Sequence, residues 1–134
     1  MVHDESMVPT LRPGDRLLVD PSAFHERLPA VGDLVVLVDP EEASRWLVKR
    51  VVGVGPGEFW ITRTGLVPSV PSVAHRSPPP DAVENVVLGH RMVYVTGDAA
   101  EVARDSRSFG PVRLDSLLGR VYRCYAPPER RRDF

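Results

Sequence analysis

The sequence contains one cysteine, one lysine and no long hydrophobic run. Cys124 has no second cysteine to pair with, which excludes an internal disulfide and a cysteine-based metal cluster and gives no sign of an oxidising compartment. No run of about 18 apolar residues occurs, and the first residues lack the basic and apolar regions of a secretory signal. We therefore expect the chain as written to carry neither a membrane span nor an export signal.

An excess of charge of one sign is also lacking. The 134 residues include 17 Lys and Arg and 18 Asp and Glu, for a net charge of −1. No global feature therefore points to nucleic acid or to a strongly charged substrate. A chain of this length buries roughly two thirds of its unfolded surface, so we predict a single globular domain over residues 1–134.

Short apolar segments separated by turn residues form the main pattern of the chain. No stretch keeps a 3.6-residue apolar period over three turns, so the sequence predicts an all-β or mostly β fold. The segment 58–62 follows Gly55-Pro56-Gly57 and is expected to pair with residues 46–54 as a hairpin. Predicted strands cover residues 16–20, 33–39, 46–54, 58–62, 91–98 and 119–126, and short helical turns are expected at residues 22–28 and 113–119.

Two segments depart from the strand pattern. Residues 66–85 are rich in Pro and Ser, and their triple proline cannot donate hydrogen bonds inside a sheet, which predicts an irregular surface insertion. Residues 126–134 are charged and led by proline, which predicts a mobile tail.

Lys49 is the only lysine in a chain that has 16 arginines, and it lies within the predicted strand 46–54. Strand alternation places it on the same face as Leu47 and Val51. Burial among such neighbours lowers the pKa of an amine and lets it act as a base. A serine nucleophile needs such a partner, and Ser/Lys pairs are one solution. The alternatives are a charge on an edge strand that reaches solvent for Lys49, and an ordinary turn hydroxyl for Ser6.

Four segments stand in the order of the conserved boxes of type I signal peptidases. They read SMVPTL, GDLVVL, VKRVVGVGPG and GDAAEVARDSRSFGPV, at residues 6–11, 32–37, 48–57 and 97–112. Between residues 4 and 125 the chain therefore resembles this family. The resemblance implies a peptidase domain on a small β-barrel-like catalytic fold with coiled antiparallel sheets. It also implies a serine endopeptidase that removes a leader or pro-segment from a precursor protein or peptide, without cofactor, metal or nucleic acid.

The resemblance also assigns roles to individual residues. Ser6 would be the nucleophile and Lys49 the general base, and the backbone N–H of Ser6 would be the first oxyanion donor. Met7 would pack beside the pair and exclude water. The support residues would be Asp98, beside the site, and Asp105 with Arg107, as an ion pair behind the lysine or an ordinary surface pair. None of the histidines, at positions 3, 25, 75 and 90, is needed.

Three positions depart from the family pattern. Asp4 stands where members have a serine or glycine, and an ionised Asp cannot donate to an oxyanion. Either its side chain points away, or that half of the oxyanion site is built differently. Ala103 replaces a serine that often contacts the lysine, and Ala99 replaces an asparagine.

Family members also carry membrane helices before the serine, whereas here five residues precede Ser6. A truncated chain, a start codon assigned too late, or a soluble relative would explain this. We favour the compact type that resembles the nickel-type superoxide dismutase maturation proteases. The chain as written would be cytoplasmic, and membrane-anchored with an extracytoplasmic site if an upstream helix is missing.

Two other functions fit parts of the pattern. A LexA-like self-cleaving domain pairs Ser-Met with a later Val-Lys-Arg but lacks Pro-Thr-Leu and the last box. A pseudoprotease that binds peptides by strand addition would explain Asp4, Ala99 and Ala103. Oligomeric state stays open.

Overall fold

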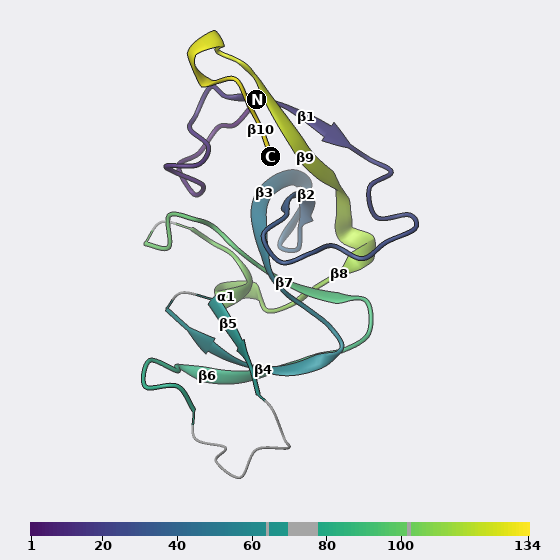
Figure 1. Cartoon of the computed structure of the whole chain (residues 1–134), viewed down its shortest axis with the longest axis vertical. Helices are drawn as coiled ribbons and strands as arrows, with labels where there is room; N and C mark the ends of the chain where they lie inside the picture. The colour runs from purple at the N-terminus through teal and green to yellow at the C-terminus, as the bar shows by residue number, and fades with distance from the viewer. Residues whose placement is uncertain (64, 70–77, 102) are drawn as a thin grey trace.

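The computed structural model describes residues 1–63, 65–69, 78–101 and 103–134 and consists of two antiparallel sheets (Figure 1). The strands are β1 (Arg16–Asp20), β2 (Leu34–Asp39), β3 (Glu42–Val54), β4 (Gly57–Thr62), β5 (Gly65–Pro68), β6 (Glu84–Leu88), β7 (Met92–Thr96), β8 (Val112–Arg113), β9 (Leu117–Ala126) and β10 (Arg132–Asp133). The helical elements are α1 (Ser106–Phe109), η1 (Leu114–Ser116) and η2 (Pro128–Arg130). The prediction of a mostly β fold is confirmed. No helix in the described ranges has the length and apolar character needed to cross a membrane.

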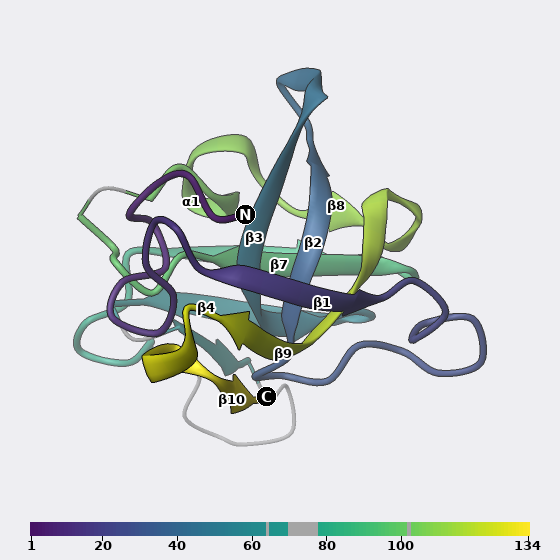
Figure 2. The same ribbon diagram turned by 90° about the horizontal axis from the view of Figure 1, so that it is seen from above.

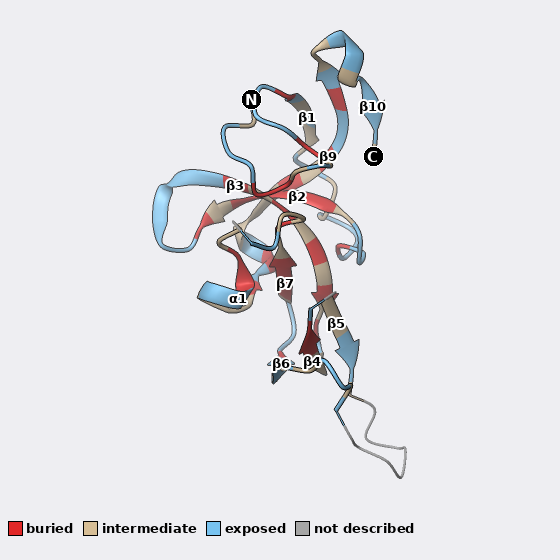
Figure 3. Ribbon diagram, turned by 90° about the vertical axis from the view of Figure 1, so that its left-hand side faces the viewer, coloured by how far each residue is buried: buried red, intermediate tan, exposed pale blue. Residues whose placement is uncertain are grey.

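The larger sheet has the strand order β1-β9-β2-β3-β7-β8, with β10 added on β9. Its long β2–β3 hairpin projects from the body of the molecule (Figure 2). The tip of this hairpin is exposed, whereas the lower halves of both strands are buried (Figure 3). The strand that carries Lys49 therefore lies in the interior of the sheet, between β2 and β7.

Side-chain alternation along β3 follows the predicted register. Leu47, Lys49 and Val51 are buried, while the residues between them are only partly covered. Val35 of β2 lies opposite Lys49, and Val95 of β7 lies opposite Val51. Because β3 is flanked on both sides, the explanation of Lys49 as an edge-strand charge is wrong.

The hairpin expected between residues 46–54 and 58–62 does not form. β3 pairs with β2 and β7, and β4 instead forms the centre of the smaller sheet, β5-β4-β6. The chain changes sheet at Gly55, where an added Cβ would lie 2.0 Å from the carbonyl oxygen of Gly89. Only glycine permits this approach of two backbones. Sequence spacing alone suggested the local pairing, and the contact with Gly89 is not visible in it.

The helical turns also differ from the prediction. Residues 22–28 form turns without a helix, and η1 covers only three residues before β9 begins. Gly119, expected to end a helix, lies within β9, where an added Cβ would meet the Asp20 carbonyl oxygen at 2.4 Å. The short helix α1 was not predicted.

The boundaries of the Pro- and Ser-rich insertion are corrected at both ends. Residues 66–68 belong to β5 and residues 84–85 to β6, so the ends of this segment form the smaller sheet. β5 is an edge strand, where Pro68 is tolerated because one side of the strand needs no hydrogen-bond donors. The prediction for residues 70–77 lies outside the described residues.

The tail is docked rather than mobile. β10 pairs with β9, and the Phe134 carbonyl oxygen accepts a hydrogen bond from Arg120 at 2.6 Å. Arg130 donates to both carboxylate oxygens of Asp15, at 2.6 and 2.9 Å. Burial alone would raise the pKa of Asp15, but the hydrogen bonds from Arg130 and from the Arg12 backbone lower it on balance. The partner that orders the tail lies 115 residues away, which explains why composition suggested mobility.

We expect Arg130→Ala to lower the free energy of unfolding by about 3 kcal/mol, the low end of the range for a broken buried pair. Asp15 is 1% exposed, so its carboxylate would lose its main partner without gaining water, while the Arg130 side chain is 25% exposed. Urea unfolding of Arg123→Ala is the matched control, because Arg123 pairs with an exposed carboxylate and should change stability little. Equal losses in the two variants would contradict a docked tail.

Candidate active site

Ser6 lies in a tight turn that two buried side chains hold against the larger sheet. Met7 is 2% exposed and Leu11 is fully buried, and both pack with Leu34 and Val36 of β2. Within the turn, the Leu11 N–H donates to the Met7 carbonyl oxygen at 2.9 Å. Ser6 itself is 7% exposed. The apolar residues after the serine therefore set its position from one side.

Asp98 holds the same turn from the other side. It follows β7, accepts a hydrogen bond from the Thr10 hydroxyl at 2.5 Å, and receives two from the Arg50 guanidinium at 2.9 Å each. Burial would raise the pKa of Asp98, but hydrogen bonds from Arg50 and Thr10 lower it. The prediction placed Asp98 beside the site. The contributions of Arg50 and Thr10 were missed, although both stand inside the boxes VKR and PTL.

The backbone of the nucleophile turn lies directly against the segment after β7. The Ala99 N–H donates to the Ser6 carbonyl oxygen at 2.9 Å, and the Asp98 N–H donates to the Met7 sulfur at 3.4 Å. A Cβ added at Gly97 would lie 2.6 Å from the Ser6 carbonyl oxygen and 2.4 Å from the Ala103 side chain. Gly97, the first residue of the GDAAEVARDSRSFGPV segment, is therefore small enough for the Ser6 backbone to pack against it.

Lys49 lies on β3 and is 2% exposed. Burial lowers its pKa below the ordinary value of 10.5, and the negative charges of Asp4 and Asp105 only partly offset that effect. Among the residues that the structure describes, its ammonium group makes no hydrogen bond or ion pair. A buried amine with weak charge compensation is easily deprotonated, and its neutral form is a base.

Asp4 links the two predicted catalytic residues. The Ser6 N–H donates to its Oδ1 at 3.0 Å, and Arg45 lies 3.9 Å from its other oxygen. Burial would raise the pKa of Asp4, but hydrogen bonds from Ser6, followed by the charges of Lys49 and Arg45, lower it. One carboxylate therefore accepts a hydrogen bond from the Ser6 backbone and also carries a charge that acts on Lys49.

This arrangement corrects one expectation about Asp4. Its side chain does not point away from the nucleophile; it occupies the backbone N–H of Ser6 that was expected to be the first oxyanion donor. An acceptor within two residues of a turn N–H commonly closes such a local hydrogen bond. The donor becomes available only when the carboxylate moves.

Asp105 and Arg107 form an ion pair whose charges act on Lys49. Asp105 is fully buried and caps α1, accepting from the Arg107 backbone at 3.0 Å and from the Gly97 N–H at 2.8 Å. The Arg107 guanidinium pairs with the same carboxylate. Burial would raise the pKa of Asp105, but the hydrogen bonds of Arg107 and Gly97 lower it. Because Asp105 is fully buried, this is not an ordinary surface pair.

A further ion pair near the site was missed. Arg104 pairs with Asp39, which is 1% exposed, and with Glu41 at 2.8 Å. These contacts tie the segment after β7 to the end of β2. Within the described ranges, no group of His, Cys, Asp or Glu side chains is arranged to hold a metal ion.

Comparison with known proteins identifies a matching protein family and proteins of similar sequence. The family model described as signal peptidase, peptidase S26, matches residues 1–67. Mitochondrial ATP-independent inner membrane protease subunit 1b of Arabidopsis thaliana is 36% identical over 89% of this chain and 64% of its own length. Mitochondrial inner membrane protease subunit 2 of Mus musculus is 31% identical over 96% of this chain and 67% of its own length. The chain thus spans about two thirds of the length of these two relatives.

The fold has a counterpart among solved structures. A signal peptidase I from Enterococcus faecalis superposes with a TM-score of 0.53 and 18% identity, covering 70% of this chain and 97% of that one. The sheets described above are therefore of the signal peptidase I class. The chain belongs to the signal peptidase family, peptidase S26. This membership decides against a LexA-like domain.

Proposed function

We propose that this chain cleaves a leader or pro-segment from a precursor protein, with Ser6 as the nucleophile and Lys49 as the general base. The observation that carries the proposal is the burial of the only lysine in an interior strand, together with the charge of Asp4, which acts on Lys49 and whose carboxylate accepts from the Ser6 backbone. A surface lysine would keep its proton at neutral pH and could not activate a hydroxyl.

The reaction would proceed by acyl transfer. Neutral Lys49 accepts the hydroxyl proton as Ser6 Oγ attacks the scissile carbonyl carbon, and the resulting ammonium returns a proton to the leaving amine. A water molecule then attacks the acyl carbon while Lys49 takes its proton. The bond to Ser6 Oγ breaks, the ammonium returns the proton to Oγ, and the product leaves with a new carboxyl terminus. Each half-reaction needs a neutral amine at its start, so burial of Lys49 serves the chemistry.

Oxyanion stabilisation requires a change at Asp4. The Ser6 N–H is the nearest backbone donor to the reacting atom but is bonded to Asp4 Oδ1. We propose that the substrate carbonyl takes over this N–H and that the carboxylate turns toward Arg45, which already lies 3.9 Å away. Asp98, with Arg50 and Thr10, would hold the turn in place during this exchange.

The partner that this site requires is a precursor polypeptide. We further propose the compact type of peptidase for this chain, because within the described residues its second sheet consists of three short strands. The net charge of −1 and the ordinary composition give no reason to add a nucleic-acid partner.

Incubation of the wild type and Ser6→Ala with a peptide library, analysed by mass spectrometry, tests the function. Cleavage products from the wild type that are absent with Ser6→Ala are expected. Thr10→Ala should retain partial cleavage, because it weakens the support of the turn without removing the nucleophile. Products that are identical for the wild type and Ser6→Ala would refute the proposed nucleophile, and the absence of any product with a library bound by both would favour a peptide-binding pseudoprotease.

A further inference from the structure

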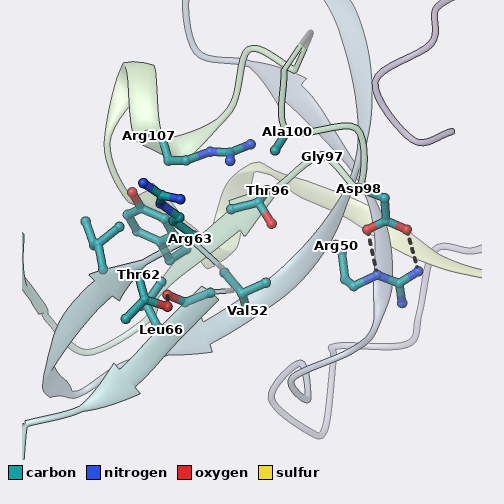
Figure 4. A pocket seen from close by; sticks show the side chains of 13 residues that line it. Arg50, Val52, Thr62, Arg63, Leu66, Thr96, Gly97, Asp98, Ala100 and Arg107 are labelled. Atoms are coloured by element: carbon teal, nitrogen blue, oxygen red, sulfur yellow. Dashed lines mark hydrogen bonds and ion pairs between the residues drawn. The ribbon is translucent and has the colours of Figure 1, made fainter. Parts of the chain in front are cut away.

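A pocket of about 320 Å³ lies on the face of β3 opposite Lys49. Arg50 and Val52 of β3 line it together with residues of the smaller sheet and of the segment after β7 (Figure 4). Arg50 and Val52 alternate with Lys49 and Val51 along the strand, so they project from the other face of β3. Gly97 and Asp98, which contact the nucleophile turn, also line the pocket. Its polar lining includes Arg50, Arg63, Arg107, Tyr94, Thr96 and Asp98.

The pocket holds more positive charge than its ion pairs neutralise. Arg50 is paired with Asp98 through two hydrogen bonds, and Arg107 is paired with Asp105. Arg63 is exposed and forms no ion pair or hydrogen bond within the part of the chain that the structure describes. Figure 4 shows Arg63 and Arg107 at one end of the pocket and the Arg50–Asp98 pair at the other. Among the described residues, the guanidinium of Arg63 is thus available to bind an anion.

The hydroxyl of Tyr94 is the second feature of this pocket. Tyr94 is 1% exposed, and its hydroxyl has no hydrogen-bond partner among the described residues. Burial raises the pKa of Tyr94 to about 12, so the hydroxyl stays protonated and can donate. An unpaired buried hydroxyl is unfavourable and calls for an explanation. Tyr94 lines the pocket, but its hydroxyl has less than 1 Å² of accessible surface, so a negatively charged acceptor would satisfy it only as a lining side chain moves aside.

We propose that this pocket binds a small oxyanion group, a phosphate or a carboxylate. The guanidinium of Arg63 supplies the unneutralised charge, and the hydroxyl of Tyr94 and the outer face of Arg107 supply donors. Guanidinium groups and neutral hydroxyls are the side chains that recognise such anions. This site is independent of the proposed peptidase activity.

Thermal unfolding with inorganic phosphate tests the proposal, in a buffer without other oxyanions and with sodium chloride matching the ionic strength. A ligand that binds only the folded state raises the Tm with its concentration. We expect a saturable rise for the wild type. In Arg63→Gln and in Tyr94→Phe, at least half of that rise should be lost. Arg16→Gln and Tyr122→Phe, which change an exposed guanidinium and an exposed phenol outside the pocket, should keep it.

The Tm without phosphate separates binding from a structural role. Tyr94→Phe should then unfold at the same or a higher temperature, since it removes an unpaired buried hydroxyl. Arg63→Gln should fold normally because Arg63 is exposed, so the proposal stays testable if Tyr94→Phe is unstable. Equal rises in all five proteins would reflect the general stabilising effect of phosphate and would overturn the proposal.

Sodium acetate in place of phosphate distinguishes the two sources of the oxyanion. A rise with both anions that depends on Arg63 and Tyr94 assigns the pocket to oxyanions in general, including carboxylates of a polypeptide. A rise with phosphate alone assigns it to phosphate groups. No specific rise with either anion refutes an oxyanion site.

Discussion

Replacing Lys49 by methionine is expected to abolish cleavage and at the same time to stabilise the fold. Methionine has nearly the shape of lysine but cannot accept the Ser6 proton. Without the general base the Ser6 hydroxyl is not activated, so kcat/KM should fall by at least about 10²- to 10⁴-fold. Lys49 is 2% exposed without an ion pair in the described part of the chain. Removing its charge should raise the free energy of unfolding at neutral pH by about 1–4 kcal/mol, the range known for buried ion pairs replaced by apolar residues.

The pH dependence of stability and of activity also tests the role of Lys49. Burial lowers the pKa of Lys49 in the folded chain relative to 10.5 in the unfolded chain. The folded state therefore binds fewer protons between these two pKa values, and the stability of the wild type should rise with pH across that window. Activity should also rise with pH, because only the neutral amine is a base. In Lys49→Met the stability rise in that window should disappear.

Lys49→Arg tests whether the reaction needs a base at this position or only a positive charge. A guanidinium stays protonated at every accessible pH, so this variant should be inactive although it preserves the charge. Arg45→Met is the matched control for stability, because Arg45 is an exposed cation near the same carboxylate, and it should change the free energy of unfolding by no more than about 0.5 kcal/mol. An active Lys49→Arg variant, or a destabilised Lys49→Met, would contradict the proposed role.

Replacing Asp4 by glycine is expected to increase cleavage. The carboxylate of Asp4 holds the Ser6 N–H at 3.0 Å and lies where negative charge would oppose a developing oxyanion. A single oxyanion donor is worth about 10²- to 10³-fold in rate. Since the substrate already competes for this N–H in the wild type, we expect Asp4→Gly to recover only part of that factor, roughly tenfold in kcat.

Asp4→Asn distinguishes the hydrogen bond from the charge. Its amide oxygen can still accept the Ser6 N–H, so the maximal rate should change less than in Asp4→Gly. Both variants remove a negative charge that raises the pKa of Lys49. The acid limb of the pH–rate profile should therefore move to lower pH in both. Glu5→Gln, which neutralises the exposed neighbouring carboxylate, is the control and should leave the profile in place.

A lower maximal rate in Asp4→Gly would show that Asp4 assists the reaction instead of occupying the donor. An unchanged pH profile in Asp4→Asn would show that its charge does not reach Lys49. These outcomes are independent of each other, because one concerns the Ser6 N–H and the other concerns the amine.

Local features of the sequence predicted the strand that carries Lys49 and the turn that carries Ser6. Alternation along residues 47–51 depends only on the two-residue period of a strand, so it predicted the buried face of β3 correctly. The four boxes likewise identified the family. The Asp4 hydrogen bond spans two residues but was not predicted, because both side-chain directions are compatible with the same turn composition.

Contacts between distant segments were decided by the tertiary structure alone. The pairing of Asp98 with Arg50 spans 48 residues, and that of Arg130 with Asp15 spans 115. Such pairs leave no periodic trace in the sequence, because their geometry depends on how the whole sheet closes. The same holds for β4. Its side-chain alternation is compatible with either sheet, and the chain enters the second sheet where Gly55 packs closely against Gly89. The sequence by itself determined which residues face inward, and packing of the two sheets decided which of them meet.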